Sequence, residues 1–171
     1  MKNNIILIGM PAVGKSTVGV ILAKIMGYRF VDTDIVIQET ENRLLSEIIS
    51  AEGVDGFIET ENRIVSQLDT ERAVIATGGS VVYGEKAMKH LSENGIVVYL
   101  QLDYKTLKNR LGNIRNRGVV MRDGQDLPEL YRERTPLYEK YADVIISEND
   151  CGIEETVTKI IYALDKNKNS I

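Results

Sequence analysis

The segment Gly9–Thr17 has the pattern Gly-x-x-x-x-Gly-Lys-Ser of a phosphate-binding loop. The glycines let successive backbone N–H groups point at phosphate oxygens, and the helix expected next adds its positive end. Lys15 is then expected to reach the β- and γ-phosphates, and Ser16 to offer its hydroxyl to Mg²⁺. A nucleoside triphosphate site is therefore predicted, the alternative being a glycine-rich turn that binds nothing. Its residues are Gly9, Ala12, Val13, Gly14, Lys15, Ser16 and Thr17, the last packing or capping the helix rather than acting as a ligand.

Two carboxylates, Asp32 and Asp34, follow the second predicted strand. They lie at the edge of an open α/β sheet where ligands bind. Asp32 is placed to assist Mg²⁺ through water, because that ion keeps its hydration shell, and Asp34 to accept a proton or hydrogen bond from a substrate hydroxyl. The alternative is that Thr33 or Asp34 caps the helix predicted at 35–41, which does not exclude a ligand role.

A glycine pair, Gly78 and Gly79, ends the third predicted strand in a turn poor in side chains. Such a turn can offer backbone N–H groups to substrate oxygens at close approach. The alternative is a simple turn at the exit of the strand.

Arginines gather late in the chain and are suited to phosphates and carboxylates, because the guanidinium fork makes paired charge-assisted bonds. Most of them are expected to be solvated. Segment 112–125 interrupts the pattern of elements and predicts a lid that excludes water during transfer of a phosphate, the alternative being a solvated basic loop. The arginines concerned are Arg110, Arg115, Arg117, Arg122, Arg132 and Arg134.

Apolar β-rich runs alternate with helical patterns, which predicts an α/β fold with a parallel sheet covered by helices. Strands are expected at 4–8, 28–31, 73–76, 96–102 and 143–147. Helices are expected at 16–26, 35–41, 44–51, 55–68, 84–93, 104–111, 126–141 and 153–166.

Length and composition indicate a single domain of 171 residues with net charge −4 and no broad basic face, so a nucleic-acid partner is not expected. The single cysteine, Cys151, excludes an internal disulfide framework and fits a reducing compartment. The N-terminal residues lack the pattern of a signal peptide, and no apolar stretch approaches membrane-spanning length. A cytoplasmic protein without membrane contact is expected.

These motifs, in this order and spacing and together with Arg134-Thr135-Pro136-Leu137-Tyr138, resemble shikimate kinase over nearly the whole chain. The resemblance implies a P-loop NTPase fold like that of nucleoside-monophosphate kinases, a three-layer sandwich around a five-stranded parallel sheet. It implies one domain, 1–171, with a substrate-binding helical region at about 33–61 and a lid at about 112–125, and we expect a monomer. The implied reaction transfers the γ-phosphate of ATP to the 3-hydroxyl of shikimate, with Mg²⁺ as cofactor.

On the nucleotide side, the resemblance implies that Lys15 and Ser16 serve the phosphates and Mg²⁺, with Asp32 as the carboxylate on the metal side. Arg110 corresponds to the arginine that flanks adenine. Arg117 corresponds to the lid arginine that reaches the transferring phosphate, and it is the catalytic residue expected beside Lys15 and Asp34.

On the acceptor side, Asp34 corresponds to the residue that holds the hydroxyls of shikimate. Gly78 and Gly79 match the glycines of the substrate site, and Arg134 matches an arginine that binds the substrate carboxylate. We expect the partners to be ATP and a small hydroxylated acid.

The chain departs from the family pattern at three places. The family has Phe-Arg-x-x-Glu where residues 57–61 read Phe-Ile-Glu-Thr-Glu, so Ile58 replaces a second carboxylate-binding arginine. Arg63 does not substitute, because five positions along a helix turn the side chain by about 140°. Ser80 replaces the third glycine of the family, and Val119 and Val120 follow Arg117-Gly118 where a proline and leucines are usual.

Loss of one charged hydrogen-bond partner of a carboxylate costs about 1.5–3 kcal/mol, or roughly ten- to a hundredfold in affinity. The favoured interpretation is phosphorylation of shikimate in a rearranged pocket. The alternatives are a related kinase for another small hydroxylated metabolite, and a nucleotide-binding regulatory protein without turnover. The presence of Lys15, Ser16, Asp32 and Asp34 argues against the regulatory protein.

Overall fold

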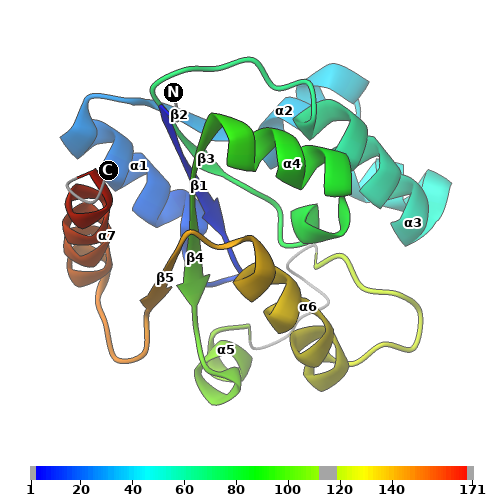
Figure 1. Cartoon of the computed structure of the whole chain (residues 1–171). Helices are drawn as coiled ribbons and strands as arrows, with labels where there is room; N and C mark the ends of the chain where they lie inside the picture. Colours follow the sequence, from blue (N-terminus) through cyan, green and yellow to red (C-terminus); the bar gives the residue numbers. More distant parts are fainter. Residues whose placement is uncertain (1–2, 112–118, 169–171) are drawn as a thin grey trace.

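The computed structural model describes residues 3–111 and 119–168. Its centre is a five-stranded sheet with the order β2-β3-β1-β4-β5 (Figure 1), in which all strand pairs are parallel. The strands are β1 (Asn4–Ile8), β2 (Arg29–Asp32), β3 (Ala73–Ala76), β4 (Gly95–Gln101) and β5 (Val144–Ser147). The helices are α1 (Lys15–Met26), α2 (Thr33–Glu41), α3 (Leu45–Val65), α4 (Glu85–Asn94), α5 (Tyr104–Leu111), α6 (Leu127–Tyr141) and α7 (Ile153–Lys168), with a 3₁₀ turn, η1 (Val81–Tyr83).

The helices cover both faces of the sheet and give three layers. Figure 1 shows α1 and α7 together on one side of the sheet, and α4 and α6 on the other. Every residue of β1 is buried, as expected for a central strand of a parallel sheet, because helices cover both of its faces. The predicted α/β sandwich with a five-stranded parallel sheet is confirmed.

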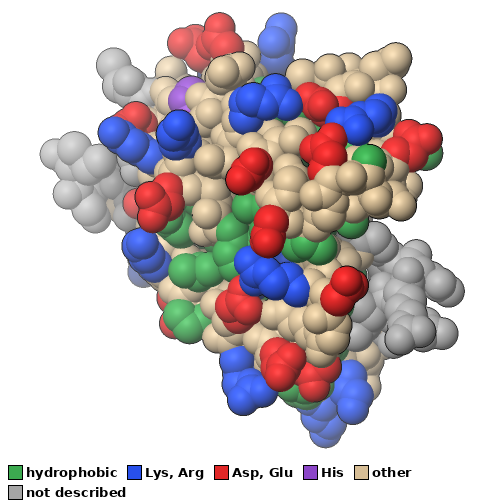
Figure 2. All heavy atoms as spheres, turned by 90° about the vertical axis from the view of Figure 1, so that its right-hand side faces the viewer, with side chains coloured by type: hydrophobic (Ala, Val, Ile, Leu, Met, Phe, Trp, Pro, Cys, Tyr) green, Lys and Arg blue, Asp and Glu red, His purple; other side chains and the backbone are tan. Residues whose placement is uncertain are grey.

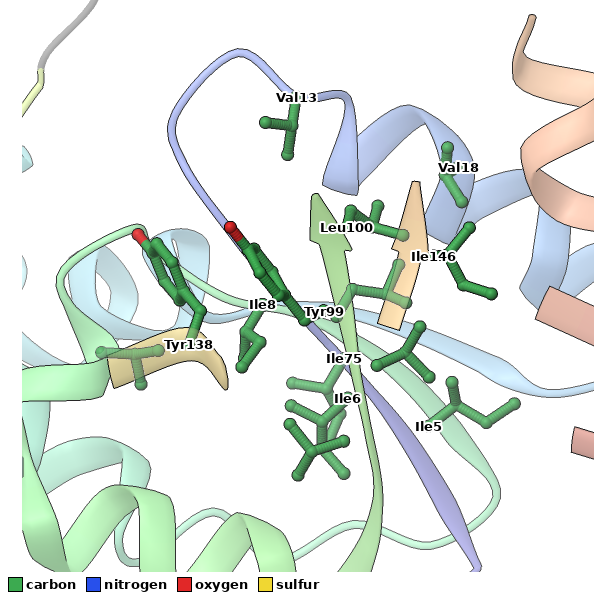
Figure 3. Packing of buried hydrophobic residues seen from close by; sticks show 14 of the residues in the cluster. Ile5, Ile6, Ile8, Val13, Val18, Ile75, Tyr99, Leu100, Tyr138 and Ile146 are labelled. Carbon is green, nitrogen blue, oxygen red and sulfur yellow. The ribbon is translucent and has the colours of Figure 1, made fainter. Parts of the chain in front are cut away.

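The main core lies on the central strands. Ile6 is fully buried and pairs in register with Ile75 of β3 and Val97 of β4. Figure 3 shows this packing and, at its edge, Tyr99 stacked on Tyr138 of α6 with ring centroids 5.1 Å apart. A second, smaller cluster joins α2 and α3 and consists of Ile37, Ile48, Phe57, Ile64 and Val120.

Most predicted boundaries agree with the structure to within one or two residues, and those of β1 and β3 agree fully. The helices predicted at 44–51 and 55–68 correspond to the two halves of α3, which a kink at Gly53 separates, and the second half ends at Val65, three residues before the predicted end. Gly53 has φ 72° and ψ 178°, a backbone conformation that a residue with a side chain rarely adopts. The sequence analysis missed the turn η1.

Charges of both signs are interspersed on the face that Figure 2 shows, and neither sign forms a broad patch there. Within residues 3–111 and 119–168, no helix combines the length and the apolar character needed to cross a membrane.

Candidate active site

The phosphate-binding loop connects β1 to α1 and folds tightly against β4. A side chain on Gly9 would lie 2.6 Å from the carbonyl oxygen of Leu100, so only glycine fits there. Gly14 has φ 98° and stands before the first residue of α1 without a side-chain cap among the described residues. The first N–H groups of α1 are therefore open to an anion, as a phosphate site requires.

Lys15 is buried and lies folded back over the loop. Its Nζ donates hydrogen bonds to the carbonyl oxygens of Gly9 at 2.7 Å and Met10 at 2.8 Å. Burial lowers the pKa of Lys15 to about 8, although Asp34 opposes the shift. A bound phosphate would add negative charge beside Nζ and favour the protonated amine.

Ser16 and Asp32 meet at the start of α1. Ser16 Oγ donates to Asp32 Oδ2 at 2.9 Å, and the other carboxylate oxygen accepts from the backbone N–H of Asp34 at 3.0 Å. Asp32 is thus the N-cap of α2, so the alternative that Thr33 or Asp34 caps this helix is wrong. The helix starts two residues earlier than predicted, and Thr33 Oγ1 instead accepts from the N–H of Gly78 at 3.2 Å.

Asp34 faces the turn that contains Gly78. Burial raises the pKa of Asp34, the Asp32 carboxylate raises it further, and Lys15 lowers it. A side chain on Gly78 would lie 2.5 Å from Glu61 Oε1 and 3.0 Å from Asp34 Oδ1. The glycine therefore leaves room for two carboxyl groups against the backbone of the turn.

Arg134 reaches the same turn from α6 and is only 1% exposed. Its Nη2 donates to the carbonyl oxygen of Val120 at 2.6 Å, and its Nε donates to Tyr83 Oη at 3.2 Å. Nη1 is buried and has no hydrogen-bond partner in the described part of the chain. Since Nη1 would lie 3.0 Å from a side chain on Gly79, this unsatisfied donor borders the glycine turn and suits an anionic ligand.

One pocket of about 270 Å³ joins the loop to Arg134, near the lower end of the roughly 300–1,000 Å³ typical of small-ligand sites. Nine predicted site residues thus line a single space, namely Ala12, Gly14, Lys15, Ser16, Thr17, Asp34, Gly78, Gly79 and Arg134. The lining is Pro11, Ala12, Gly14, Lys15, Ser16, Thr17, Asp34, Leu45, Phe57, Thr77, Gly78, Gly79, Ser80, Val120 and Arg134.

Two predicted loop residues do not line this pocket. Val13 is buried in the core and only 1% exposed (Figure 3), and its carbonyl oxygen accepts a hydrogen bond from Arg110. Gly9 contributes the carbonyl that accepts from Lys15. Thr17 lines the pocket, although a role in capping or packing was predicted for it.

Arg110 lies at the end of α5 beside the loop, outside the lining of this pocket. Its Nη1 is 3.4 Å from the carbonyl oxygen of Val13 and 3.6 Å from Glu148 Oε2. Glu148 is 3% exposed, and burial raises the pKa of its carboxyl while Arg110 lowers it. The sequence analysis missed Glu148, which directly follows β5 at the ligand-binding edge of the sheet and could have been found there.

Glu61 is the second carboxyl group beside the turn that contains Gly78. It is 1% exposed, and its Oε2 accepts a hydrogen bond from Ser80 Oγ at 2.6 Å. Its Oε1 has no hydrogen-bond partner among the described residues. Burial raises the pKa of Glu61 to about 7, since the opposing effects of Ser80 and Arg134 are smaller.

Arg63 does not enter the pocket, as predicted. Its Nη2 pairs with Glu41 Oε1 at 2.6 Å, and its side chain is 52% exposed. Ile58 is half-buried and does not line the pocket either. Arg134 is therefore the one arginine in this lining among the residues that the structure describes.

Residues 112–118 of the predicted lid, Arg117 among them, lie outside the described residues. In the described part, Val120 is buried against the second cluster and supplies the carbonyl for Arg134. Arg122 pairs with Asp55 of α3 at 3.3 Å and Glu133 of α6 at 3.2 Å, whereas Arg132 is exposed.

A phosphate-binding loop and a buried arginine that line one pocket at the carboxyl edge of a parallel sheet define the class, a P-loop phosphotransferase for a small molecule. A family model described as "Shikimate kinase" matches residues 11–165. The chain therefore belongs to the shikimate kinase family, and it is an ATP-dependent small-molecule kinase.

Individual relatives agree with this membership. The shikimate kinase of Pasteurella multocida is 33% identical, over 96% of this chain and 96% of its own length. That of Clostridium botulinum (strain Loch Maree) is 37% identical, over 95% of this chain and 96% of its own length. The structure "Shikimate kinase from Acinetobacter baumannii in complex with shikimate" aligns with a TM-score of 0.88 and 31% identity, covering 97% of this chain and 94% of that chain.

Glu61→Gln is expected to stabilise the protein more at pH 8 than at pH 5. The pKa of Glu61 is raised from 4.5 to about 7 in the fold, so between these values the unfolded chain releases a proton that the folded chain keeps. Stability from this group therefore falls as pH rises through that window. Glutamine does not titrate, so its advantage in free energy of unfolding should grow by about 1–3 kcal/mol from pH 5 to pH 8.

Urea unfolding at the two pH values measures this difference. Glu59→Gln, at an exposed position on the same helix, is the matched control and should show no such growth. An advantage of Glu61→Gln that is equal at pH 5 and pH 8 would contradict a raised pKa.

Proposed function

We propose that this protein transfers the γ-phosphate of ATP to the 3-hydroxyl of shikimate. The observation that carries the proposal is that Lys15, Asp34 and the unsatisfied Nη1 of Arg134 border one pocket. An amine for phosphates, a carboxylate for a hydroxyl and a guanidinium for a carboxylate are the groups that this reaction needs. Relatives that are shikimate kinases, and the similar structure of a shikimate kinase in complex with shikimate, support the same substrate.

On the nucleotide side, the N–H groups of the loop and of the first turn of α1 hold the phosphates, and Lys15 exchanges its loop carbonyls for phosphate oxygens. Arg110, held between Val13 and Glu148, flanks the base. We also propose that Arg117 reaches the transferring phosphate, as the resemblance implies.

The residues present fit Mg²⁺, because Ser16 Oγ and the Asp32 carboxylate lie 2.9 Å apart and offer the oxygen donors that this ion prefers. Ser16 would hold the ion directly, and Asp32 would do so through water. When bound, the ion neutralises charge on the phosphate oxygens.

On the acceptor side, Arg134 Nη1 binds the substrate carboxylate, while the backbone of Gly78 and Gly79 lies against the ring hydroxyls. Asp34 accepts a hydrogen bond from the reacting hydroxyl and orients its oxygen toward the phosphate. Because burial raises the pKa of Asp34, this carboxylate is also a better proton acceptor than an exposed aspartate. Phe57 and Val120 keep water from the pocket, which prevents loss of phosphate to hydrolysis.

A second candidate is a related kinase acting on another small hydroxylated acid. It is favoured by Ile58, which leaves Arg134 as the arginine of the described pocket lining and so provides less charge for a carboxylate than the family pattern does. We also propose that the protein acts as a cytoplasmic monomer, with 33–61 as the substrate-binding region and 112–125 as the lid.

Release of ADP from Mg²⁺-ATP in the presence of shikimate tests the proposed function. Wild-type protein should phosphorylate shikimate with saturation kinetics. Lys15→Met should lower kcat by at least about a hundredfold, because the positive charge beside the β- and γ-phosphates is lost. Lys24→Met, at an exposed position of the same helix, is the matched control. Rejection of shikimate together with turnover of homoserine, threonine, gluconate, quinate or inositol would favour the second candidate.

Ile58→Arg is expected to improve the use of shikimate. Position 58 precedes Glu61 by three residues on α3 and so shares its face, and Oε1 of Glu61 has no described partner. An arginine there would pair with Glu61 and add a second cation for the carboxylate, lowering KM for shikimate by roughly ten- to a hundredfold.

Steady-state kinetics at fixed ATP measure this change, and Ile35→Arg at a 52% exposed position of α2 controls for added charge. An unchanged KM would mean that the pocket differs in geometry from that of the family.

A further inference from the structure

A polar network outside the pocket lining is centred on Tyr83 in the turn η1. Tyr83 Oη donates to Glu133 Oε1 at 2.5 Å and accepts from Arg134 Nε at 3.2 Å. The direction of both bonds is fixed, because a guanidinium can only donate and an ionised carboxylate can only accept. The Tyr83 hydroxyl thus links the Glu133 carboxylate to Arg134.

We propose that Tyr83 is a positioning residue that sets the affinity of the site for the substrate carboxylate by holding Arg134 in place. The proposal rests on the proposed function, in which Arg134 binds that carboxylate. Tyr83 adds a new element to that function, because the phosphate-binding loop, the aspartates and the glycine turn do not account for the orientation of Arg134.

The guanidinium of Arg134 is a rigid plane that two hydrogen bonds anchor at Nε and Nη2, and the Tyr138 hydroxyl also interacts with it. Nε is held by Tyr83 and Nη2 by the carbonyl oxygen of Val120 at 2.6 Å, which leaves Nη1 toward the glycine turn. With one anchor removed, the plane can rotate about the other, and Nη1 loses its fixed direction. Pre-organised donors bind more tightly because less freedom is lost on binding.

Glu133 is itself held by two side chains of the segment that precedes α6. Its Oε1 pairs with Arg122 Nη1 at 3.2 Å, and its Oε2 accepts from Gln125 Nε2 at 2.8 Å. Arg122 also reaches Asp55 of α3 at 3.3 Å. The hydrogen bond from Tyr83, together with the contacts of Arg122 and Gln125, lowers the pKa of Glu133, so this carboxyl group remains an ionised acceptor.

The ring of Tyr83 makes contacts that do not depend on its hydroxyl. The guanidinium carbons of Arg134 and Arg122 lie 5.3 and 5.8 Å from the ring centroid, within cation–π range. Tyr83→Phe keeps this ring in place. The substitution therefore removes the anchor of Nε with little effect on packing.

Tyr83→Phe in the full chain should raise KM for shikimate about tenfold, while kcat and KM for ATP change less than about twofold. Tyr131→Phe is the matched control, since the Tyr131 hydroxyl donates to the carbonyl of Leu102 at 3.0 Å away from Arg134. Glu133→Gln keeps an acceptor for Tyr83 and should raise KM less than Tyr83→Phe does. In an Arg134→Ala background, Tyr83→Phe should have no further effect, whereas a further rise in KM would overturn the proposal.

A second measurement, the ¹⁵N–¹H spectrum of the arginine Nε–H groups, tests the positioning without any substrate. The Arg134 signal, identified by its absence in Arg134→Lys, should be exchange-protected in wild-type protein and broadened or lost in Tyr83→Phe. An unchanged signal overturns the positioning. A lost signal with unchanged KM for shikimate instead refutes carboxylate binding by Arg134, and the inferred role of Tyr83 in substrate affinity falls with it.

Discussion

The register of the parallel strands is the constraint on which the site depends. Leu7 of β1 pairs with Ala76 of β3 and Val98 of β4, and Asp32 of β2 pairs with the same Ala76. The phosphate-binding loop, the Asp32 carboxylate and the glycine turn therefore leave the sheet at one level, although they are distant in sequence. A shift of one residue would turn each side chain to the opposite face and separate these groups. β1 is buried along its whole length, so the apolar core holds the strands that carry these groups.

Charged groups of both signs are brought together at this edge of the sheet. Lys15, Asp34, Glu61 and Arg134 are all buried or line the same pocket, and burial shifts the pKa of the first three toward their neutral forms. Such groups cost stability when no ligand is present, and a ligand with matching charges relieves that cost. The polar site is thus destabilised in the free protein, and the apolar core must offset that cost.

The sequence predicted the parts of the molecule that local patterns determine. The spacing of its glycines and lysine predicts the phosphate-binding loop, and short runs of Ile, Val, Leu and Ala predict β1 and β3. Helical periodicity predicts that Arg63 stays outside the pocket. The cap of α2 was assigned wrongly because Thr33 and Asp34 are as suitable for an N-cap as Asp32, and only the backbone angles decide among them. The pairs Ser80–Glu61 and Arg110–Glu148 join distant parts of the chain, so no local pattern could reveal them.

The bond from Arg134 to Val120 ends on a main-chain carbonyl rather than on a side chain. Every amino acid supplies that acceptor, so the identity of residue 120 is decoupled from the anchoring of the guanidinium. What position 120 must supply is apolar bulk, since its side chain packs with Ile37, Ile48 and Phe57. Valine at position 120, where leucine is usual in the family pattern, therefore keeps the contact to Arg134.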